Sequence, residues 1–248
     1  MIALRTTYEV FRRELASLFV SPIAYLVLFF FLLINGVTFW FYIQVSGGNL
    51  EVLLNSQYSS ITFWFLSLLI PPLLTMRTLA EEQRQGTYES LITTGVSETS
   101  LVVAKFAACW LFFAILWASL LPPYFLLEWQ AADLDWGMIG CVHGGVLLVG
   151  ALFTAIGIFA SSFTKNQLVA ASAAVILNLF VFFVHYFRFL YDAGDYELRY
   201  FQYISPLAHF GEDFTRGVFD YRYVTLYLSF AVLFLFMGVK SLERRRWW

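Results

Sequence analysis

Charged side chains are scarce in this sequence. Asp, Glu, Lys and Arg make up 13% of its 248 residues, against about 25% in an average soluble domain. Hydrophobic residues reach 60%, aromatic residues 20%, and the mean hydropathy is +0.72. This composition excludes a soluble enzyme and predicts a polytopic membrane protein. The formal net charge of −2 provides no basic surface, so we expect no nucleic-acid partner.

Residue types that build catalytic and metal sites are also few. The two cysteines, Cys109 and Cys141, lie in apolar runs without the spacing of a zinc or redox site. The three histidines are far apart, and the sequence has no GxxxxGKS/T phosphate loop, HExxH or GxSxG motif. For His143 and Asn178, inside expected spans, we favour structural hydrogen bonds over a site. We therefore expect no catalysis, metal ion or cofactor in this chain.

Six apolar runs are long enough to cross a bilayer. A helix needs about 20 residues to span a hydrocarbon core of roughly 30 Å. The runs predict an all-α membrane protein with a single transmembrane domain over residues 1–248. We place the spans at about residues 22–42, 59–76, 101–127, 136–159, 167–186 and 223–239.

Proline pairs lie near the ends of two of these spans. We expect Pro71-Pro72 in the second span and Pro122-Pro123 in the third span to bend or locally unwind their helices. Between the first two spans, residues 43–58 have the composition of a short polar loop.

Residues 2–19 have the pattern of an amphipathic helix. Arg5, Arg12 and Arg13 face away from an apolar stripe. The stretch is too charged to span a membrane, so we predict a helix in the headgroup plane with its basic side chains toward anionic lipids. The stripe consists of Leu4, Tyr8, Phe11, Leu15 and Leu18.

A further short helix is expected over residues 206–217, inside the longest polar segment. Ser205 and Pro206 are residue types preferred at a helix cap and first turn, and Gly217 would close the helix. About 12 residues are too few to cross a bilayer. We therefore predict an interfacial or re-entrant helix on the outer side, with an apolar face of Leu207, Phe210, Phe214 and Val218.

The distribution of basic residues predicts the orientation. Eleven of the fifteen Lys and Arg residues fall in four segments, and the first two loops between them hold none. The positive-inside rule places these segments, and therefore both termini, in the cytoplasm of a cell whose inner membrane holds the protein. The four segments are 1–21, 77–105, 161–166 and 240–248.

The most polar connection between two spans covers residues 77–98. A simple reversal needs only about five residues, whereas this segment is far longer and carries six charged residues. We predict two short helices, interrupted at Gly86 and ended at Gly95, that form a docking surface. A solvated loop is the alternative for the carboxylates, and a positive-inside anchor is the alternative for Arg77.

The same segment carries the residues of a known family signature. LTMR at 74–77 and AEEQRQGTYESL at 80–91 resemble the pattern LTMRxxAEExxxGTxExLLT of ABC-2 type permeases. ASSFTKNQ at 160–167 and RGVFD at 216–220 resemble two further landmarks of that family. The resemblance covers nearly the whole chain and is closest to the gliding-motility-associated permease subfamily.

The resemblance implies the membrane subunit of an ATP-driven exporter. Such permeases pair as two six-span halves, as a homodimer or a paralogous heterodimer. Each half binds a cytoplasmic ABC ATPase that holds ATP and Mg²⁺. The implied ATPase-coupling residues are Arg77, Glu81, Glu82, Arg84, Gly86, Thr87, Glu89 and Leu91. The implied residues of the interfacial helix are Arg5, Phe11, Arg12 and Arg13, and those of an outer helix capping the path are Pro206, Phe210, Phe214 and Gly217.

A non-transporting role would leave a similar sequence. A membrane anchor or platform of an ATPase-driven motility or secretion assembly would dock an ATPase in the same way. In both cases the carboxylates of Glu81, Glu82 and Glu89 would pair with basic residues of the ATPase. Flux across vesicles separates the two hypotheses, because a platform predicts ATP turnover without solute movement.

Overall fold

The computed structural model describes residues 2–87, 96–129, 134–190 and 203–245. Every regular element in these ranges is a helix, and six stretches are long and apolar enough to span a membrane. The prediction of an all-α polytopic membrane protein is therefore confirmed. The six stretches are Pro22–Ser46, Ile61–Gln85, Glu98–Trp129, Trp136–Phe163, Gln167–Tyr186 and Tyr221–Arg244.

Turns and breaks divide the chain into individual helices. The first half contains α1 (Ile2–Val20), α2 (Pro22–Ser46), α3 (Leu50–Tyr58), α4 (Ile61–Thr75), α5 (Ala80–Gln85) and α7 (Glu98–Ala118). The second half contains α8 (Pro122–Trp129), α9 (Trp136–Phe163), α10 (Gln167–Leu190), α12 (Pro206–Glu212), the 3-10 helix η1 (Phe214–Arg216) and α13 (Tyr221–Arg245).

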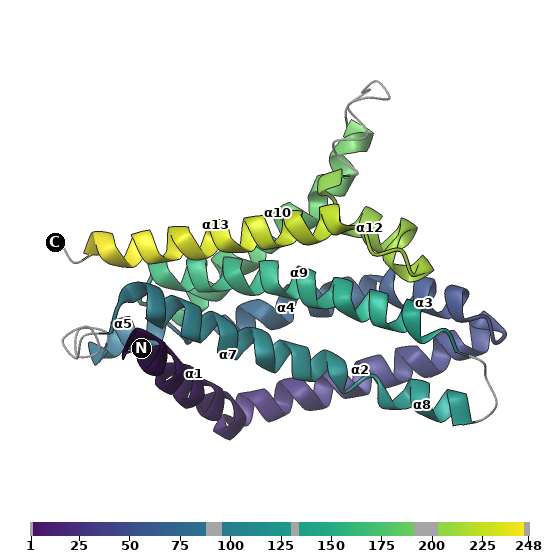
Figure 1. Ribbon diagram of the computed structural model, residues 1–248, viewed down its shortest axis with the longest axis horizontal. Helices are drawn as coiled ribbons and strands as arrows, with labels where there is room; N and C mark the ends of the chain where they lie inside the picture. Colours follow the sequence, from purple (N-terminus) through teal and green to yellow (C-terminus); the bar gives the residue numbers. More distant parts are fainter. Residues whose placement is uncertain (1, 88–95, 130–133, 191–202, 246–248) are drawn as a thin grey trace.

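Helix α9 is the central helix of the bundle (Figure 1) and packs against α4, α7, α10 and α13. Glycines on α9 allow its neighbours to approach closely. A Cβ atom added at Gly150 would lie 2.1 Å from the ring of Phe113. A Cβ atom added at Gly157 would lie 2.1 Å from Thr75 Oγ1. Small residues at these positions therefore set the spacing of α9 from α7 and α4.

Helices α2, α10 and α13 expose large apolar side chains. Trp40 on α2 is 65% exposed, Phe180 on α10 is 63% exposed and Val232 on α13 is 65% exposed. In water such faces would be unfavourable, whereas lipid tails or another apolar helix cover them well. The exposed faces thus agree with a bundle that lies in a membrane.

The expected polar loop at residues 43–58 is wrong for all but residues 47–49. Helix α2 continues to Ser46, and residues 50–58 form α3. Asn49 caps this helix by accepting a hydrogen bond from the N–H of Val52. Leu54 and Tyr58 are four residues apart, on the same face of the helix, and both are fully buried. This apolar face packs α3 against the bundle.

The third membrane-spanning stretch is broken near its end, as expected. Helix α7 ends at Ala118, and α8 begins at Pro122. Proline is favoured at the first position of a helix because that position has no intrahelical partner for an N–H group. The pair Pro122-Pro123 therefore restarts the helix in place of continuing it.

Helix α4 instead continues through Pro71 and Pro72 as far as Thr75, so the expected local unwinding does not occur. Pro72 has no N–H group to donate to the Leu68 carbonyl four residues earlier. The side chain of Asn178 on α10 donates to that carbonyl at 3.4 Å. A side chain of the neighbouring helix α10 thus replaces the hydrogen-bond donor that the Leu68 carbonyl loses to the proline. The structural hydrogen bond predicted for Asn178 is confirmed.

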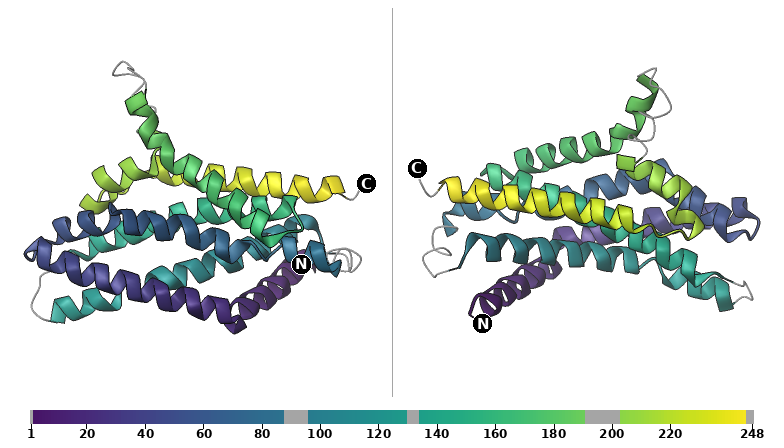
Figure 2. Two further views of the ribbon diagram at one scale, coloured as in Figure 1. Left: turned by 180° about the vertical axis from the view of Figure 1, so that it is seen from behind. Right: turned by 45° about the horizontal axis from the view of Figure 1, so that its top comes forward.

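The two ends of the bundle hold different elements. The start of α1, the helix α5 and the end of α13 gather at one end, while α3, α8 and α12 lie toward the other (Figures 1 and 2). Helix α1 meets α2 at a corner near Ser21 and packs along α7. The polar end with α5 contains most of the residues that the sequence singles out.

Candidate functional site

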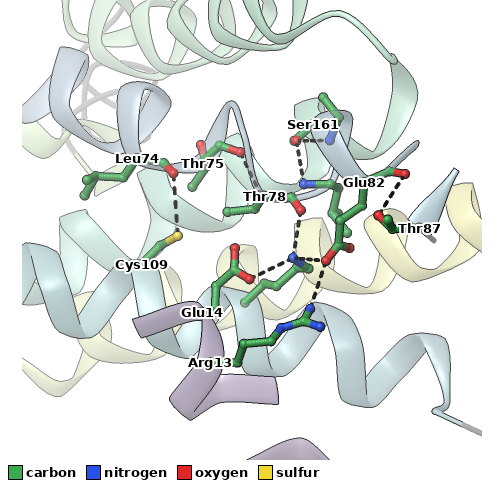
Figure 3. Close-up of polar contacts among 12 residues, drawn as sticks. Arg13, Glu14, Leu74, Thr75, Thr78, Glu82, Thr87, Cys109 and Ser161 are labelled. Atoms are coloured by element: carbon green, nitrogen blue, oxygen red, sulfur yellow. Dashed lines mark hydrogen bonds and ion pairs between the residues drawn. The ribbon is translucent and has the colours of Figure 1, made fainter. Parts of the chain in front are cut away.

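Two serines anchor α5 to the end of α9. Ser161 Oγ accepts hydrogen bonds from the backbone N–H groups of Leu79 (3.2 Å) and Ala80 (3.0 Å), which otherwise lack partners at a helix start. Gln83 Nε2 donates to the Ser162 carbonyl at 3.1 Å. Both serines are buried, and Figure 3 shows Ser161 directly beside the start of α5. The position of α5 is thus fixed by a helix far along the chain.

Lys105, near the start of α7, is buried inside the bundle, and its side chain is 1% exposed. Its Nζ atom lies 3.0 Å from Glu14 Oε2, 2.9 Å from Glu82 Oε1 and 2.7 Å from the Thr78 carbonyl oxygen. An ammonium group has three N–H donors, so each donor has an acceptor. A buried charge without such partners would be strongly unfavourable, and these contacts explain why an apolar helix tolerates a lysine.

A second cation, Arg13, completes this group. Arg13 Nη2 lies 3.1 Å from Glu82 Oε1, and its side chain is 54% exposed against 14% for Glu82. We name Arg13, Glu14, Glu82 and Lys105 the ionic junction (Figure 3). Two cations face two carboxylates, so the junction is electrically balanced.

The ionic junction ties together three helices that are distant in the sequence. Arg13 and Glu14 belong to α1, Glu82 belongs to α5 and Lys105 belongs to α7. Exposed ion pairs contribute little to stability, but removing one partner of a buried pair is strongly destabilising. A displacement of α5 therefore carries α1 and α7 with it unless the contacts to Lys105 break.

The predicted residues at the end of α5 are less enclosed. Glu81 is half-buried, and its Oε1 accepts a hydrogen bond from Gln85 Nε2 at 3.1 Å. Gly86 ends the helix with φ +72°, a left-handed conformation that favours glycine, so the predicted interruption is confirmed. Thr87 Oγ1 donates at 3.4 Å to a backbone carbonyl of α5. The segment predicted as a second short helix, with Glu89, Leu91 and Gly95, lies outside the described residues.

Four predicted arginines stay at the surface of this end. Arg5 and Arg12 on α1, Arg77 before α5 and Arg84 on α5 are exposed. None of them forms an ion pair with another residue in the described ranges. Arg13 is the one predicted arginine of α1 that the structure brings into the ionic junction.

Helix α1 buries part of the predicted stripe, because Phe11 and Leu18 pack against the core. Val10 is 6% exposed, whereas Tyr8 of the predicted stripe is 60% exposed. Phe11 is half-buried, at the edge of the contact. Glu14 lies on the packed side of the same helix and pairs with Lys105.

The helix predicted over residues 206–217 is shorter and is packed into the core. Helix α12 stops at Glu212, η1 follows, and Gly217 closes the turn with φ +79°. Ser205 Oγ caps the helix by accepting from the N–H of Ala208 at 3.3 Å, and Pro206 occupies its first turn, as predicted. Val218 is 50% exposed, so the predicted apolar face ends one turn earlier.

Aromatic rings hold α12 in place. Phe210 and Phe214 are fully buried, and the Phe210 ring lies 5.2 Å from that of Phe63 and 5.4 Å from that of Trp64. His209 Nδ1 lies 2.7 Å from Tyr227 Oη on α13. These residues fix the element against α4 and α13.

The chain also matches a known protein family. The family described as ABC-2 family transporter protein matches residues 42–239, most of the chain. The chain belongs to the ABC-2 transporter family. This permease is thus the membrane subunit of an ABC transporter and not itself catalytic, and its membership implies association with an ABC ATPase. A search of curated proteins finds no match to the chain.

The family match covers only two of the four residues of the ionic junction, Glu82 and Lys105. It includes Glu82, Lys105 and Ser161 but starts within α2, so that Arg13 and Glu14 of α1 precede it. The sequence singled out Glu82 as an ATPase contact and Arg13 as a lipid-facing residue, whereas the structure pairs the two within the chain. Glu14, Ser161 and the role of Lys105 were missed. A lysine within an apolar span is expensive without a carboxylate, and this signal could have prompted a search for its partners.

Proposed function

We propose that this permease forms the translocation path of an exporter and that α5, with the segment after it, docks a separate ATPase subunit. The ionic junction is the observation that carries the proposal. Glu82 reaches inward to Lys105, while Arg84 on α5 and Arg77 just before it are exposed and Glu81 is half-buried. One short helix therefore offers a charged surface to a partner and a buried link to the spans.

The cytoplasmic location of α5 is part of this proposal. The start of α1, α5 and the end of α13 share one end of the bundle (Figure 1), and the positive-inside rule assigns their basic residues to the cytoplasm. In this orientation α1 lies near the headgroups of the inner membrane, with Arg5 and Arg12 exposed toward lipid or the ATPase.

The mechanism follows from the contacts of α5. When the ATPase subunits close, the docked helix moves. The Glu82–Lys105 contact passes that motion to α7, and Glu82–Arg13 passes it to α1. The Ser161 cap links the same helix to α9. Packed helices respond by shifting as rigid bodies, which would open and close a path formed with a second permease subunit.

Docking is tested by charge reversal at Glu81, a half-buried residue of α5. With Glu81→Lys, the ABC ATPase should no longer purify with the permease. The basic residues of the ATPase that pair with the Glu81 carboxylate would instead be repelled by the lysine. Glu9→Lys on α1 is the matched control, since Glu9 is exposed on a neighbouring helix at the same end. Equal recovery of the ATPase with Glu81→Lys and with the unaltered chain would refute docking at α5.

Transmission is tested separately by Glu82→Gln in proteoliposomes that contain the complete transporter. We expect ATP hydrolysis to continue while movement of an NBD-labelled phospholipid, used as an amphiphilic probe, falls. The first, second and fifth spans, which would line the path, are rich in Phe and Leu and favour an amphiphilic substrate over an ion. ATP turnover without any lipid movement in the unaltered complex would instead support the platform role and, with it, a place in a motility assembly such as that of the gliding subfamily.

A further inference from the structure

A cleft of about 830 Å³ opens between the α1–α2 corner and the α4–α5 turn. This volume lies within the range of about 300–1,000 Å³ that is usual for sites of small ligands. Its walls divide into a polar half and an apolar half. The polar half includes Arg13, Arg77, Glu81, Gln85 and Lys105, and the apolar half includes Leu18, Ile23, Ala24, Val27 and Leu73.

The corner at Ser21 relates these two halves to the membrane. Helix α1 before the corner carries charged residues, whereas α2 after it has no charged residue along Pro22–Ser46. A span begins where the hydrocarbon core begins. The polar half of the cleft therefore lies at the level of the headgroups, and the apolar half lies beside the acyl chains. An occupant must be amphiphilic and oriented like a membrane lipid.

The charges in the cleft restrict the headgroup. The ionic junction is balanced by itself, because Arg13 and Lys105 offset Glu14 and Glu82. One further cation and one further anion remain in the lining, Arg77 and Glu81. An anionic headgroup would satisfy only the arginine. A headgroup with one phosphate and one ammonium satisfies both.

The carboxylate of Glu81 also distinguishes between ammonium headgroups. Glu81 is half-buried and lines the cleft, and among the described residues its carboxylate accepts one hydrogen bond, from Gln85 Nε2 at 3.1 Å. Buried carboxylate oxygens are normally paired. A primary ammonium supplies three N–H donors, whereas a quaternary choline supplies none.

We propose that this cleft holds a zwitterionic phospholipid with a primary ammonium headgroup, of the phosphatidylethanolamine class. Its phosphate lies against Arg77, its ammonium lies against the carboxylate of Glu81, and its chains follow Ile23 and Leu73. Such a lipid fills the space between the α1–α2 corner and α5 and stabilises the ionic junction. Arg77 and Glu81 are also part of the surface proposed for the ATPase, but lipid retention is measured on the chain without an ATPase, so the two proposals can fail separately.

Native mass spectrometry of the full chain in detergent tests the site directly. The chain is released in an equimolar mixture of phosphatidylethanolamine, phosphatidylcholine and phosphatidylglycerol with identical acyl chains. We expect phosphatidylethanolamine to be retained about tenfold more than either other lipid, since a hydrogen bond to a charged group has this order of effect. Equal retention of the three lipids, or preference for phosphatidylglycerol, would overturn the proposal.

Substitutions of residues that line the cleft test whether the lipid binds there. Glu81→Gln and Arg77→Gln should each reduce retention of phosphatidylethanolamine about tenfold. The matched controls Glu9→Gln and Arg222→Gln remove the same charges at exposed positions outside the cleft and should retain the lipid. Ser17→Phe, from an exposed position of α1 that lines the cleft, should displace it without loss of helix content by circular dichroism. Unchanged retention in all three cleft variants would refute this location.

Discussion

Two short helices, α5 and α12, pack against α9 toward opposite ends of the bundle, and different chemistry holds each of them. Helix α5 is held by the Ser161 cap and by the ion pair from Glu82 to Lys105. Helix α12 is held by the buried rings of Phe210 and its neighbours.

This difference indicates how each end responds to force. Apolar packing depends on buried area and is insensitive to the charge of a partner. Ion pairs and hydrogen bonds are directional, and their strength changes when a nearby charge is added or moved. The α5 end is therefore suited to sensing an ATPase, while α12 is suited to holding a fixed position against α4 and α13.

The largest expected effect is at the aromatic end. Phe210→Ala removes a fully buried ring and should lower the free energy of unfolding by about 3–5 kcal/mol. Thermal unfolding in detergent measures this loss, and the loss should not depend on salt. Phe219→Ala, at a ring that is 51% exposed, is the control and should have little effect. Similar losses in the two variants would contradict the account of α12.

Lys105→Met should be the most severe change at the ionic end, with a loss of about 3 kcal/mol, because it leaves Glu14 and Glu82 without their buried partner. Replacing all three charges, in Lys105→Met with Glu14→Gln and Glu82→Gln, should recover most of the lost stability. Denaturant unfolding of both variants provides the test. A triple variant no more stable than the single one would show that the charges do not act as one group.

Ser161→Ala should have a moderate effect, of about 1 kcal/mol. The substitution removes the acceptor for two backbone N–H groups at the start of α5. Hydrogen exchange at Leu79 and Ala80 should accelerate, while α12 keeps its protection. Ser172→Ala, at an exposed serine of α10, is the matched control. Unchanged hydrogen exchange at Leu79 and Ala80 in Ser161→Ala would show that Ser161 of α9 does not anchor α5.

Arg13→Gln should have the smallest effect, below about 1 kcal/mol, because the arginine is half-exposed. Its contribution should disappear in 1 M salt, where the Debye length is about 3 Å. Arg12→Gln, at an exposed position without an ion pair among the described residues, should have no measurable effect. If Arg13→Gln lowers the free energy of unfolding equally at high salt, the Arg13–Glu82 pair behaves as a buried ion pair and this prediction is wrong.

The features that follow local rules were predictable from the sequence. The six spans follow from the length of their apolar runs, the stop at Gly86 follows from the preference for glycine at a helix end, and the restart at Pro122 follows from its missing N–H. Helix α3 was missed because its apolar face, Leu54 and Tyr58, sits among polar residues that resemble a loop.

The ionic junction was not predictable in the same way. Glu14 and Lys105 lie 91 positions apart, and no local pattern connects them. The apolar stripe of α1 suggested a face that includes Tyr8, but Tyr8 is exposed, while Glu14 lies on the packed side of the helix and neutralises the buried ammonium of Lys105. Likewise, Ser161 was expected in a loop and became a cap only because α9 extends to Phe163.

The central claim is that α5 and α7 move together because Lys105 and Glu82 join them. Spin labels at Gln85 on α5 and Val103 on α7, both exposed, allow the distance between these helices to be measured by electron–electron resonance in the complex with its ATPase. In the unaltered junction the distance should stay the same between ATP-free and ATP-trapped states, and in Lys105→Met it should shift or broaden. A change of equal size in both proteins would contradict the claim.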